Sequence, residues 1–385
     1  LRGRTENAKV VLGSATPSLE SWMNVRRSKY TLVKMLQRAG QAKIPRIAVV
    51  DTSDGRGIFS QQLLDAISRR LDRHEQTILF LNRRGHSTSL VCSSCNEVVT
   101  CPSCNVAYTY HKTDSCLRCH ICGSWILPPS RCPGCGSTKL DYKGLGIQKA
   151  EEVLRKCFKS AKILRMDSDA VTKKKSYDDI LNTFANGGAD ILIGTQMIAK
   201  GLDFPNVTLV GVLNADASLN IPDFRAGERT FQLLSQVAGR AGRAELSGEV
   251  IIQSQRTDMP IFRHISRCEY EHFAETELGN RKEWGYPPFT HMASVTFAAK
   301  NESLVSGWAE MFSKSFQAFA RHCDLKVSEA NPCMIEKADG FYRWQIILRS
   351  PSAKILSSAW RWLIEKRQPP KALKISFDLD AYNFM

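Results

Sequence analysis

Eight cysteines form four pairs, with two residues between the members of each pair, and all lie between positions 92 and 135. The pairs are Cys92 and Cys95, Cys101 and Cys104, Cys119 and Cys122, and Cys132 and Cys135. Each pair can present two thiolates to one metal ion, and a structural zinc site takes four thiolates in a tetrahedron. The spacing therefore predicts two structural zinc ions with no open coordination position, rather than cysteines buried together by chance.

The spacing alone does not fix which pairs share an ion. The spacer between the first two pairs is shorter than the hairpin that usually sets two such pairs face to face, so a nested arrangement is favoured. In that arrangement the first pair joins the fourth, and the second joins the third. Cys116 forms a further possible pair with Cys119. We interpret Cys116 as a bystander, because the other eight cysteines pair without remainder.

Two arginines, Arg240 and Arg243, form a second candidate site in the sequence QVAGRAGR, after a helix expected from about Arg225. Residues three apart on a helix share one face. The neighbouring Gly239 and Gly242 leave room for a ligand to approach. Two guanidinium groups on one face suit a polyphosphate, since each offers a planar set of donors. The alternative is a basic helix end on a solvated surface.

Buried strands are expected to position these arginines. The apolar runs Ile191–Ile193 and Val207–Leu213 are typical of parallel strands covered on both faces. Farther upstream, Ile47–Asp51, an amphipathic helix from Ser60 to about His74, and Thr77–Leu81 give the order strand, helix, strand. Further strands are expected at Lys162–Met166, at Gly248–Gln253 and, ahead of the sequence GSATPS, at Ala8–Leu12. The predicted fold class is α/β, a parallel sheet with helices on both faces.

The pattern changes after about Thr257, where a helix over Pro260–Leu278 is expected to lead to a smaller domain. The order beyond it is β-α-β-β-α-β, which predicts an α+β sandwich of the ferredoxin-like kind. The elements expected are strand Ala293–Ala298, helix Glu302–Arg321, strand Lys326–Ser328 extending to Ile335, strand Arg343–Leu348, helix Ala353–Lys366 and strand Leu373–Phe377. Cationic and aromatic residues alternate around Arg343 and Trp344, which suits stacking against bases or an acidic peptide. The alternative is an amphipathic strand that is half buried.

The bulk composition narrows the class of protein. The chain has 385 residues, a formal net charge of +15 and a pI of about 9.3, which favours a polyanionic partner. No apolar run is long enough to span a bilayer, and no signal peptide is apparent. Paired cysteines that bind zinc indicate a reducing compartment, so we expect a cytoplasmic protein. A first residue other than Met suggests a fragment of a longer chain.

The sequences GTQMIAKGLDFPNV and QVAGRAGR resemble the fifth and sixth motifs of superfamily 2 helicases, and GSATPS resembles the third. Nearly the whole chain is similar to the C-terminal part of the bacterial primosomal helicases, the PriA or primosomal protein N′ family. The resemblance implies a second RecA-like helicase lobe, a zinc-ribbon-type insertion with nested cysteine pairing, and a C-terminal α+β domain. By this resemblance we divide the chain into the end of the first lobe (1–29), the start of the second lobe (30–90), the two-zinc insertion (91–140), the remainder of the second lobe (141–258) and the C-terminal domain (259–385).

The same resemblance implies roles for individual residues. Arg240 and Arg243 would stabilise charge on the γ-phosphate of ATP, with Gln236 directed toward the phosphates. Gly201 and Asp203 would lie near the nucleotide, with Asp203 toward the ribose. Residues expected beside nucleic acid are Thr195 and Gln196 in the lobe and Arg343 and Trp344 in the C-terminal domain. The implied cofactors are two structural zinc ions and, in the full-length protein, ATP with Mg²⁺.

The function implied is an ATP-dependent DNA helicase that restarts stalled replication forks and loads the primosome. Its expected partners are forked and single-stranded DNA, single-stranded-DNA-binding protein and other primosome proteins. One alternative is a non-catalytic zinc-ribbon adaptor that binds nucleic acid. This alternative rests on an absence, since neither GxxxxGK[ST] nor an acidic Mg²⁺-binding motif occurs in the sequence. In this family both belong to the first lobe, ahead of Leu1, so we expect ATPase activity from the full-length protein and none from this fragment alone.

Overall fold

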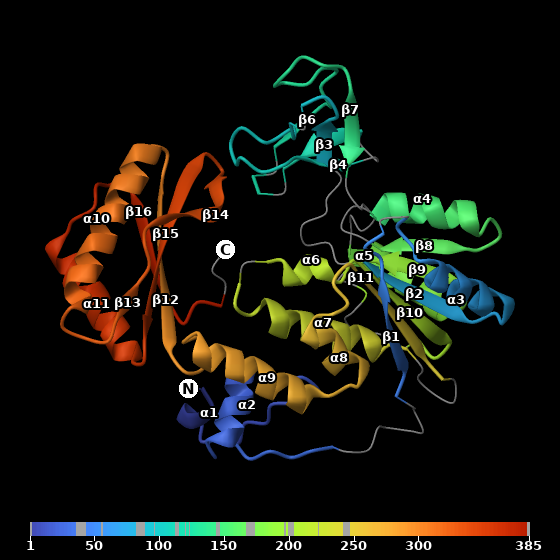
Figure 1. Ribbon diagram of the computed structural model, residues 1–385, viewed down its shortest axis with the longest axis horizontal. Coiled ribbons are helices and arrows are strands. Elements are labelled where there is room, and N and C mark those ends of the chain that lie inside the picture. Colours follow the sequence, from blue (N-terminus) through green and yellow to red (C-terminus); the bar gives the residue numbers. More distant parts are fainter. Residues whose placement is uncertain are drawn as a thin grey trace.

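The computed structural model describes most of the chain in three parts, a parallel-sheet lobe, a cysteine-rich module and a C-terminal domain (Figure 1). The described residues are 2–35, 44–54, 57–81, 89–95, 97–111, 115–119, 121–122, 124–143, 147–166, 174–195, 198, 204–221, 223–241 and 247–382. Within them, no helix combines the length and apolar character needed to cross a membrane.

The lobe is built on a six-stranded sheet in the order β1-β11-β10-β2-β9-β8, and every neighbouring pair is parallel. The strands are β1 (Arg46–Asp51), β2 (Gln76–Leu81), β8 (Ile163–Met166), β9 (Ile191–Gly194), β10 (Val207–Leu213) and β11 (Glu249–Ser254). β2, β9 and β10 are buried along their whole length. Strands that are buried on both faces need nearly continuous apolar sequences, which is why these runs predicted them. The predicted parallel sheet is confirmed.

Helices cover both faces of the sheet. Because successive side chains of a strand point to opposite faces, β2 supplies Leu79 to one face and Phe80 to the other. The Leu79 face packs against α3 (Gln61–Asp72) and α4 (Ile147–Cys157). The helices that pack on the Phe80 face are α5 (Lys174–Ala185), α7 (Ala226–Ala238) and α8 (Pro260–Ser266). Short helices α1 (Arg2–Thr5) and α6 (Asp216–Leu219) complete this part of the chain.

The C-terminal domain has the predicted ferredoxin-like order, with one strand divided. Its elements are β12 (His291–Ala299), α10 (Glu302–Ala320), β13 (Lys326–Val327), β14 (Asn331–Ala338), β15 (Phe341–Ser350), α11 (Ala353–Lys366) and β16 (Lys374–Leu379). The strands lie in the order β13-β15-β12-β16, β14 also pairs with β15, and all neighbours are antiparallel. The expected single strand over Lys326–Ile335 is therefore wrong in one respect. It is interrupted at Ser328, whose hydroxyl accepts the Ile347 N–H at 2.9 Å in place of a main-chain carbonyl.

Two helices, α10 and α11, cover one face of this C-terminal sheet. Val295 and Phe297 of β12 and Ile346 of β15 join residues of both helices in one buried cluster. The strand residues between these core positions point to the opposite face.

Two expectations for the segments around the lobe are wrong. The helix expected over Pro260–Leu278 is two helices, α8 and α9 (Tyr270–Glu283), because Cys268 adopts a left-handed backbone with φ 55° that ends the first helix. The strand expected at Ala8–Leu12 does not form, and Val11 is 91% exposed. A β-branched run becomes a strand only beside a partner strand, and none of the described strands pairs with it.

A buried ion pair joins α7 to α9 beneath the GSATPS segment. Arg281 Nη2 lies 2.7 Å from Glu228 Oε2, and the two side chains are 2% and 6% exposed. The other carboxylate oxygen of Glu228 accepts the N–H of Leu19 at 3.0 Å, at the first turn of α2 (Leu19–Arg26). Tyr270 of α9 donates its hydroxyl to the Pro17 carbonyl at 2.8 Å. These bonds hold the segment that resembles the third helicase motif against α7 and α9.

Replacement of Arg281 by methionine should lower the free energy of unfolding by about 3–5 kcal/mol, because it leaves the Glu228 carboxylate buried without its cation. Urea denaturation of the wild-type protein and the Arg281→Met variant measures this difference. The matched control is Arg26→Met, which breaks a pair with Glu275 whose side chains are both 50% exposed. That change should cost less than about 1 kcal/mol. Equal stabilities for the two variants would contradict the importance assigned to the buried pair.

The cysteine module leaves the lobe after β2 and returns ahead of α4. Its base is an antiparallel pair, β3 (Ser89–Cys92) with β7 (Leu140–Lys143). Beyond the base lies a small sheet of β4 (Thr109–His111), β5 (Cys116–Arg118) and β6 (Trp125–Ile126). Figure 1 shows the module standing above the lobe, on the side where β14 of the C-terminal domain also lies.

Candidate metal centres and nucleotide site

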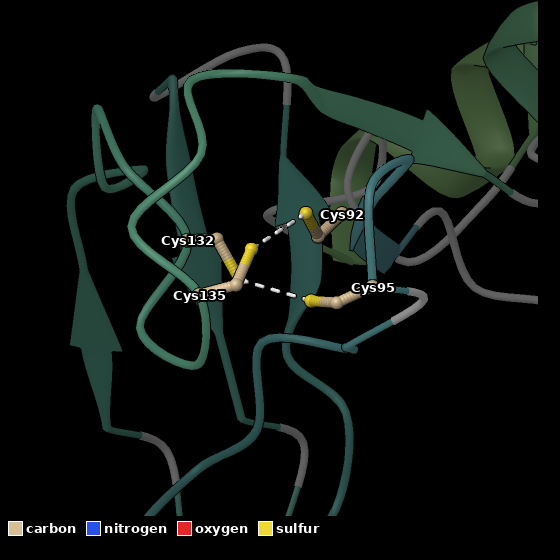
Figure 2. Close-up of side chains that lie close together, drawn as sticks. All are labelled: Cys92, Cys95, Cys132 and Cys135. Atoms are coloured by element: carbon tan, nitrogen blue, oxygen red, sulfur yellow. Dashed lines mark hydrogen bonds between the residues drawn. The ribbon is translucent and has the colours of Figure 1, made fainter.

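The first and fourth cysteine pairs form one metal centre, which we call the outer centre because its ligands flank the other two pairs in the sequence. Figure 2 shows Cys92, Cys95, Cys132 and Cys135 directed toward one another. Cys92 Sγ lies 3.6 Å from Cys135 Sγ, and Cys95 Sγ lies 3.6 Å from Cys132 Sγ. Tetrahedral zinc with Zn–S bonds of about 2.3 Å places its sulfur ligands about 3.8 Å apart. The four thiols are therefore already spaced to hold one zinc ion.

The inner metal centre gathers the second and third pairs, which confirms the nested arrangement. The Sγ atoms of the four cysteines, Cys101, Cys104, Cys119 and Cys122, all lie within 4.8 Å of one another. Cys101 Sγ and Cys122 Sγ are 3.7 Å apart, again close to the edge of a zinc tetrahedron. Cys116 belongs to neither set, and its sulfur accepts the Arg118 Nε–H at 3.4 Å. Two zinc ions with four thiolates each are the cofactors that this donor set fits.

Local backbone geometry shapes two of the four pairs for a metal. After Cys104, Asn105 takes a left-handed conformation with φ 51° and donates its N–H to the Cys101 carbonyl at 2.8 Å. After Cys135, Gly136 has φ 72° and donates to the Cys132 carbonyl at 2.9 Å. Asparagine and glycine are the residues that adopt this conformation most readily. The tight turn bends the chain around the position where the metal binds.

The outer thiols have divergent acidities. Burial raises the pKa of Cys92, but N–H groups of Cys95 and Ser94 outweigh it and lower the pKa to about 6. The Glu97 N–H acts to lower the pKa of Cys95, yet the neighbouring thiol of Cys135 and burial raise it to about 12. One thiol of the centre thus loses its proton readily, while its neighbour resists a second negative charge. A bound dication removes that resistance, since it favours both thiolates.

The inner thiols repeat this contrast. Burial raises the pKa of Cys101, but the Ser124 hydroxyl and the Ser103 N–H outweigh it and lower the pKa to about 6. Burial also raises the pKa of Cys104, to about 12, with neighbouring thiols adding to the effect. The Asp339 N–H acts on Cys104 in the opposite direction, because it stabilises the thiolate. This donor comes from the C-terminal domain.

The predicted nucleotide residues are described only in part. Thr195 is buried directly after β9, at the carboxyl end of the parallel sheet, where α/β proteins bind ligands. Gln236 is exposed on α7. Arg240 lies just beyond α7, which ends at Ala238, so the predicted helical face shared with Arg243 is not formed by this helix. The residues that lie outside the described part of the chain are Gln196, Gly201, Asp203 and Arg243.

The two predicted contacts of the C-terminal domain point to opposite faces of its sheet. Trp344 packs against the buried cluster under α10 and α11. Arg343 is its neighbour on β15 and therefore points to the face opposite α10 and α11. On that strand Phe341 lies near two cations, with Lys374 Nζ 4.9 Å and Lys300 Nζ 6.0 Å from its ring centroid. Arg343 remains a candidate for a polyanionic partner, whereas Trp344 is half-buried and packs its side chain against the core.

Sequence reasoning missed one group of contacts. The turn between β14 and β15 lies against the second cysteine pair, and it does so mainly through backbone atoms. An Asp-Gly sequence between two strands is a strong hairpin signal, so the turn itself was predictable from Asp339 and Gly340. The contact of this turn with a segment more than two hundred residues earlier was not predictable, because every residue type except proline has the same main-chain donor.

Three family descriptions match separate parts of the chain. Residues 142–245 match the helicase conserved C-terminal domain. Residues 282–382 match the primosomal protein N C-terminal domain. Residues 101–124 match the PriA DNA helicase Cys-rich region domain.

Curated relatives match along nearly the whole chain. Replication restart protein PriA of Bacillus subtilis is 38% identical over 394 residues, covering 100% of this chain and 49% of the relative. The protein of the same name from Haemophilus influenzae is 40% identical over 357 residues, covering 92% of this chain and 49% of the relative. The chain thus spans about half the length of the curated relatives it matches. Among solved structures, RecG bound to a three-way DNA junction is 14% identical and covers 63% of this chain and 23% of its own, and its TM-score of 0.36 is too low to support an argument.

Proposed function

The chain belongs to the replication restart protein PriA family, and from this premise we propose that it forms part of an ATP-dependent DNA helicase that restarts stalled replication forks and loads the primosome. In this proposal the chain supplies the second helicase lobe, a two-zinc module and the C-terminal domain. The observation that carries it is the insertion of two nested four-cysteine centres between β2 and α4 of a parallel-sheet lobe.

We propose the domain limits given by the sequence, and the positions of the described elements support them. Residues 30–90 and 141–258 contain all six strands of the parallel sheet, from β1 to β11. Residues 91–140 contain both four-cysteine centres. Residues 259–385 begin one position before α8, which packs on the lobe, so the last proposed domain starts with helices that connect it to the sheet.

The lobe would contribute one half of an ATP site. Arg240 and Arg243 would meet the charge that develops on the γ-phosphate during hydrolysis, with Gln236 toward the phosphates. Gly201 and Asp203 would contact the nucleotide. We infer that another lobe of the whole protein supplies the phosphate-binding loop and the Mg²⁺ ligands, so that hydrolysis belongs to the complete enzyme.

Nucleic acid would contact both the lobe and the C-terminal domain. Thr195 and Gln196 would lie beside DNA in the lobe, and Arg343 would face DNA or an acidic peptide from the face of the C-terminal sheet opposite α10 and α11. Support comes from the net charge of +15 and from Lys300 and Lys374, which lie beside the half-buried ring of Phe341 on the same face as Arg343. The proposed partners are forked and single-stranded DNA, single-stranded-DNA-binding protein and other primosome proteins, all in the cytoplasm.

Binding of this chain to single-stranded or forked DNA should weaken steeply as salt rises, because lysine and arginine contacts release counterions. Fluorescence anisotropy over a salt series measures the slope. Arg343→Gln should reduce the slope of log affinity against log salt by about one unit, and this reduction should be the same for DNA of any base sequence. Trp344→Ala should instead lower the stability of the C-terminal domain, since its indole packs on the core. A flat salt response, or strong selection of one base sequence, would contradict this assignment.

A further inference from the structure

The tip of the β14–β15 hairpin contacts the second cysteine pair at three points. Asp339 donates its N–H to Cys104 Sγ at 3.2 Å. Gly340 donates its N–H to the Ser103 carbonyl at 2.9 Å. Lys337 Nζ donates to the Pro102 carbonyl at 3.0 Å. One turn of the C-terminal domain therefore covers the loop that carries two ligands of the inner zinc centre.

The geometry of the turn makes both backbone donors available. Ala338 and Phe341 pair across the hairpin, which leaves a two-residue turn of Asp339 and Gly340 with φ 50° and 78°. In a turn of this type the strand ladder uses the polar groups of the flanking residues, and the N–H groups of the two central residues point outward. They would face solvent if the module were not there. Here they meet a carbonyl and a metal-binding sulfur instead.

The charges of the two surfaces are complementary. A zinc ion with four thiolates has a net negative charge, and an N–H bond to one sulfur disperses part of it. Lys337 adds a cation at the edge of the same loop, and its ammonium lies 4.7 Å from the Tyr342 ring centroid, which limits its freedom. Donors that hold metal ligands from outside the coordination sphere commonly change metal affinity by about 10–100-fold. None of the described contacts joins this turn to the outer centre.

We propose that the β14–β15 turn supports the ligands of the inner zinc centre through hydrogen bonds from outside the coordination sphere. The C-terminal domain then slows the loss of this zinc, and the zinc in turn holds the C-terminal domain against the module. The two effects are one coupling free energy seen from two sides, because linkage is reciprocal. When the inner zinc is lost, the Cys104 sulfur and the two loop carbonyls that the turn binds are no longer held in place. The C-terminal domain is then free of the module while it remains attached through α9. This inference goes beyond the proposed function and depends on neither ATP nor DNA.

The first test measures zinc release from the whole zinc-loaded chain into an excess of a chromophoric chelator. Lys337→Glu places a carboxylate beside the Pro102 carbonyl and should accelerate release from the inner centre about tenfold or more. Release from the outer centre should not change, which provides a control within the same molecule. The two phases are assigned with Cys101→Ser plus Cys122→Ser, which retains only the outer zinc. Lys326→Glu is the matched control, a charge reversal at an exposed residue on β13 of the same sheet.

The second test measures the opposite direction of the coupling and needs no change in the turn. Hydrogen exchange of the Asp339 and Gly340 amides should be slow in the zinc-loaded chain and should accelerate when Cys122→Ser disables the inner centre. Amides in the β12–β15 ladder should stay protected, since that pairing does not involve the module. If the turn amides exchange freely with zinc bound, or if Lys337→Glu and Lys326→Glu release inner zinc at the wild-type rate, the contact is incidental packing and the proposal is overturned.

Discussion

Replacement of Arg243 by alanine in the intact protein is expected to abolish DNA-stimulated ATP hydrolysis while nucleotide binding largely persists. An arginine that meets charge developing in the transition state contributes to the rate far more than to ground-state binding. Loss of such a group costs on the order of 10³-fold or more in turnover. Steady-state hydrolysis with and without forked DNA, together with nucleotide binding measured by fluorescence, separates the two effects.

Lysine at the same position supplies the matched control for this experiment. Arg243→Lys should not restore hydrolysis, because a point charge lacks the planar set of donors that a phosphate engages. Arg240→Ala should behave like Arg243→Ala, and neither substitution should change zinc content. DNA-dependent hydrolysis near the wild-type rate in both alanine variants would show that the GRAGR sequence is only a basic chain segment. The half of the ATP site assigned to Arg240 and Arg243 would then be wrong.

The double substitution Cys101→Ser plus Cys122→Ser should reduce zinc from two ions per chain to one and unfold the inner part of the module. Each structural zinc contributes an apparent binding free energy of about 10–16 kcal/mol, and in small zinc domains this is the free energy that folds them. Three inner cysteines belong to the small buried cluster of the module, whose other described members are Leu90, Val99, Tyr108 and Leu117, so little apolar core remains without the metal. Metal analysis and limited proteolysis of the module measure the two effects.

Cys116→Ser is the control for the zinc experiment, because Cys116 is buried beside the inner centre without belonging to it. Its substitution should leave two zinc ions per chain. Full zinc content after the double substitution would refute the nested pairing. A loss of zinc in Cys116→Ser would assign that cysteine to the metal.

Buried parallel strands were the most predictable part of this fold. Val207–Leu213 is apolar except for Thr208 and Gly211, and a short run of this kind is typical of a strand covered on both faces, as β10 is. The eight metal ligands were equally predictable, since the chemistry of zinc requires their residue type and spacing. For these features the sequence carries the physical cause itself.

Features that depend on distant partners were not predictable in the same way. Ala8–Leu12 has the composition of a strand, but a strand also needs a neighbour, which composition does not report. Ser328 interrupts a strand because its hydroxyl replaces a main-chain acceptor, a choice visible only once Ile347 lies opposite. Arg343 and Trp344 formed one expected binding pair, yet strand alternation sends them to opposite faces. The core under α10 decides which of the two faces inward.

The pairing of β1 with β11 has a consequence for the order in which a ribosome can release folded structure. β1 is synthesised first, but its partner spans Glu249–Ser254, so the sheet is completed only when nearly all of the lobe has been made. The cysteine module has a different schedule, because every ligand of both centres has been made once Cys135 is complete. The module can therefore close around its metal while the lobe that carries it is still an unfinished nascent chain. The availability of zinc during translation would then determine whether the module folds before the lobe is complete.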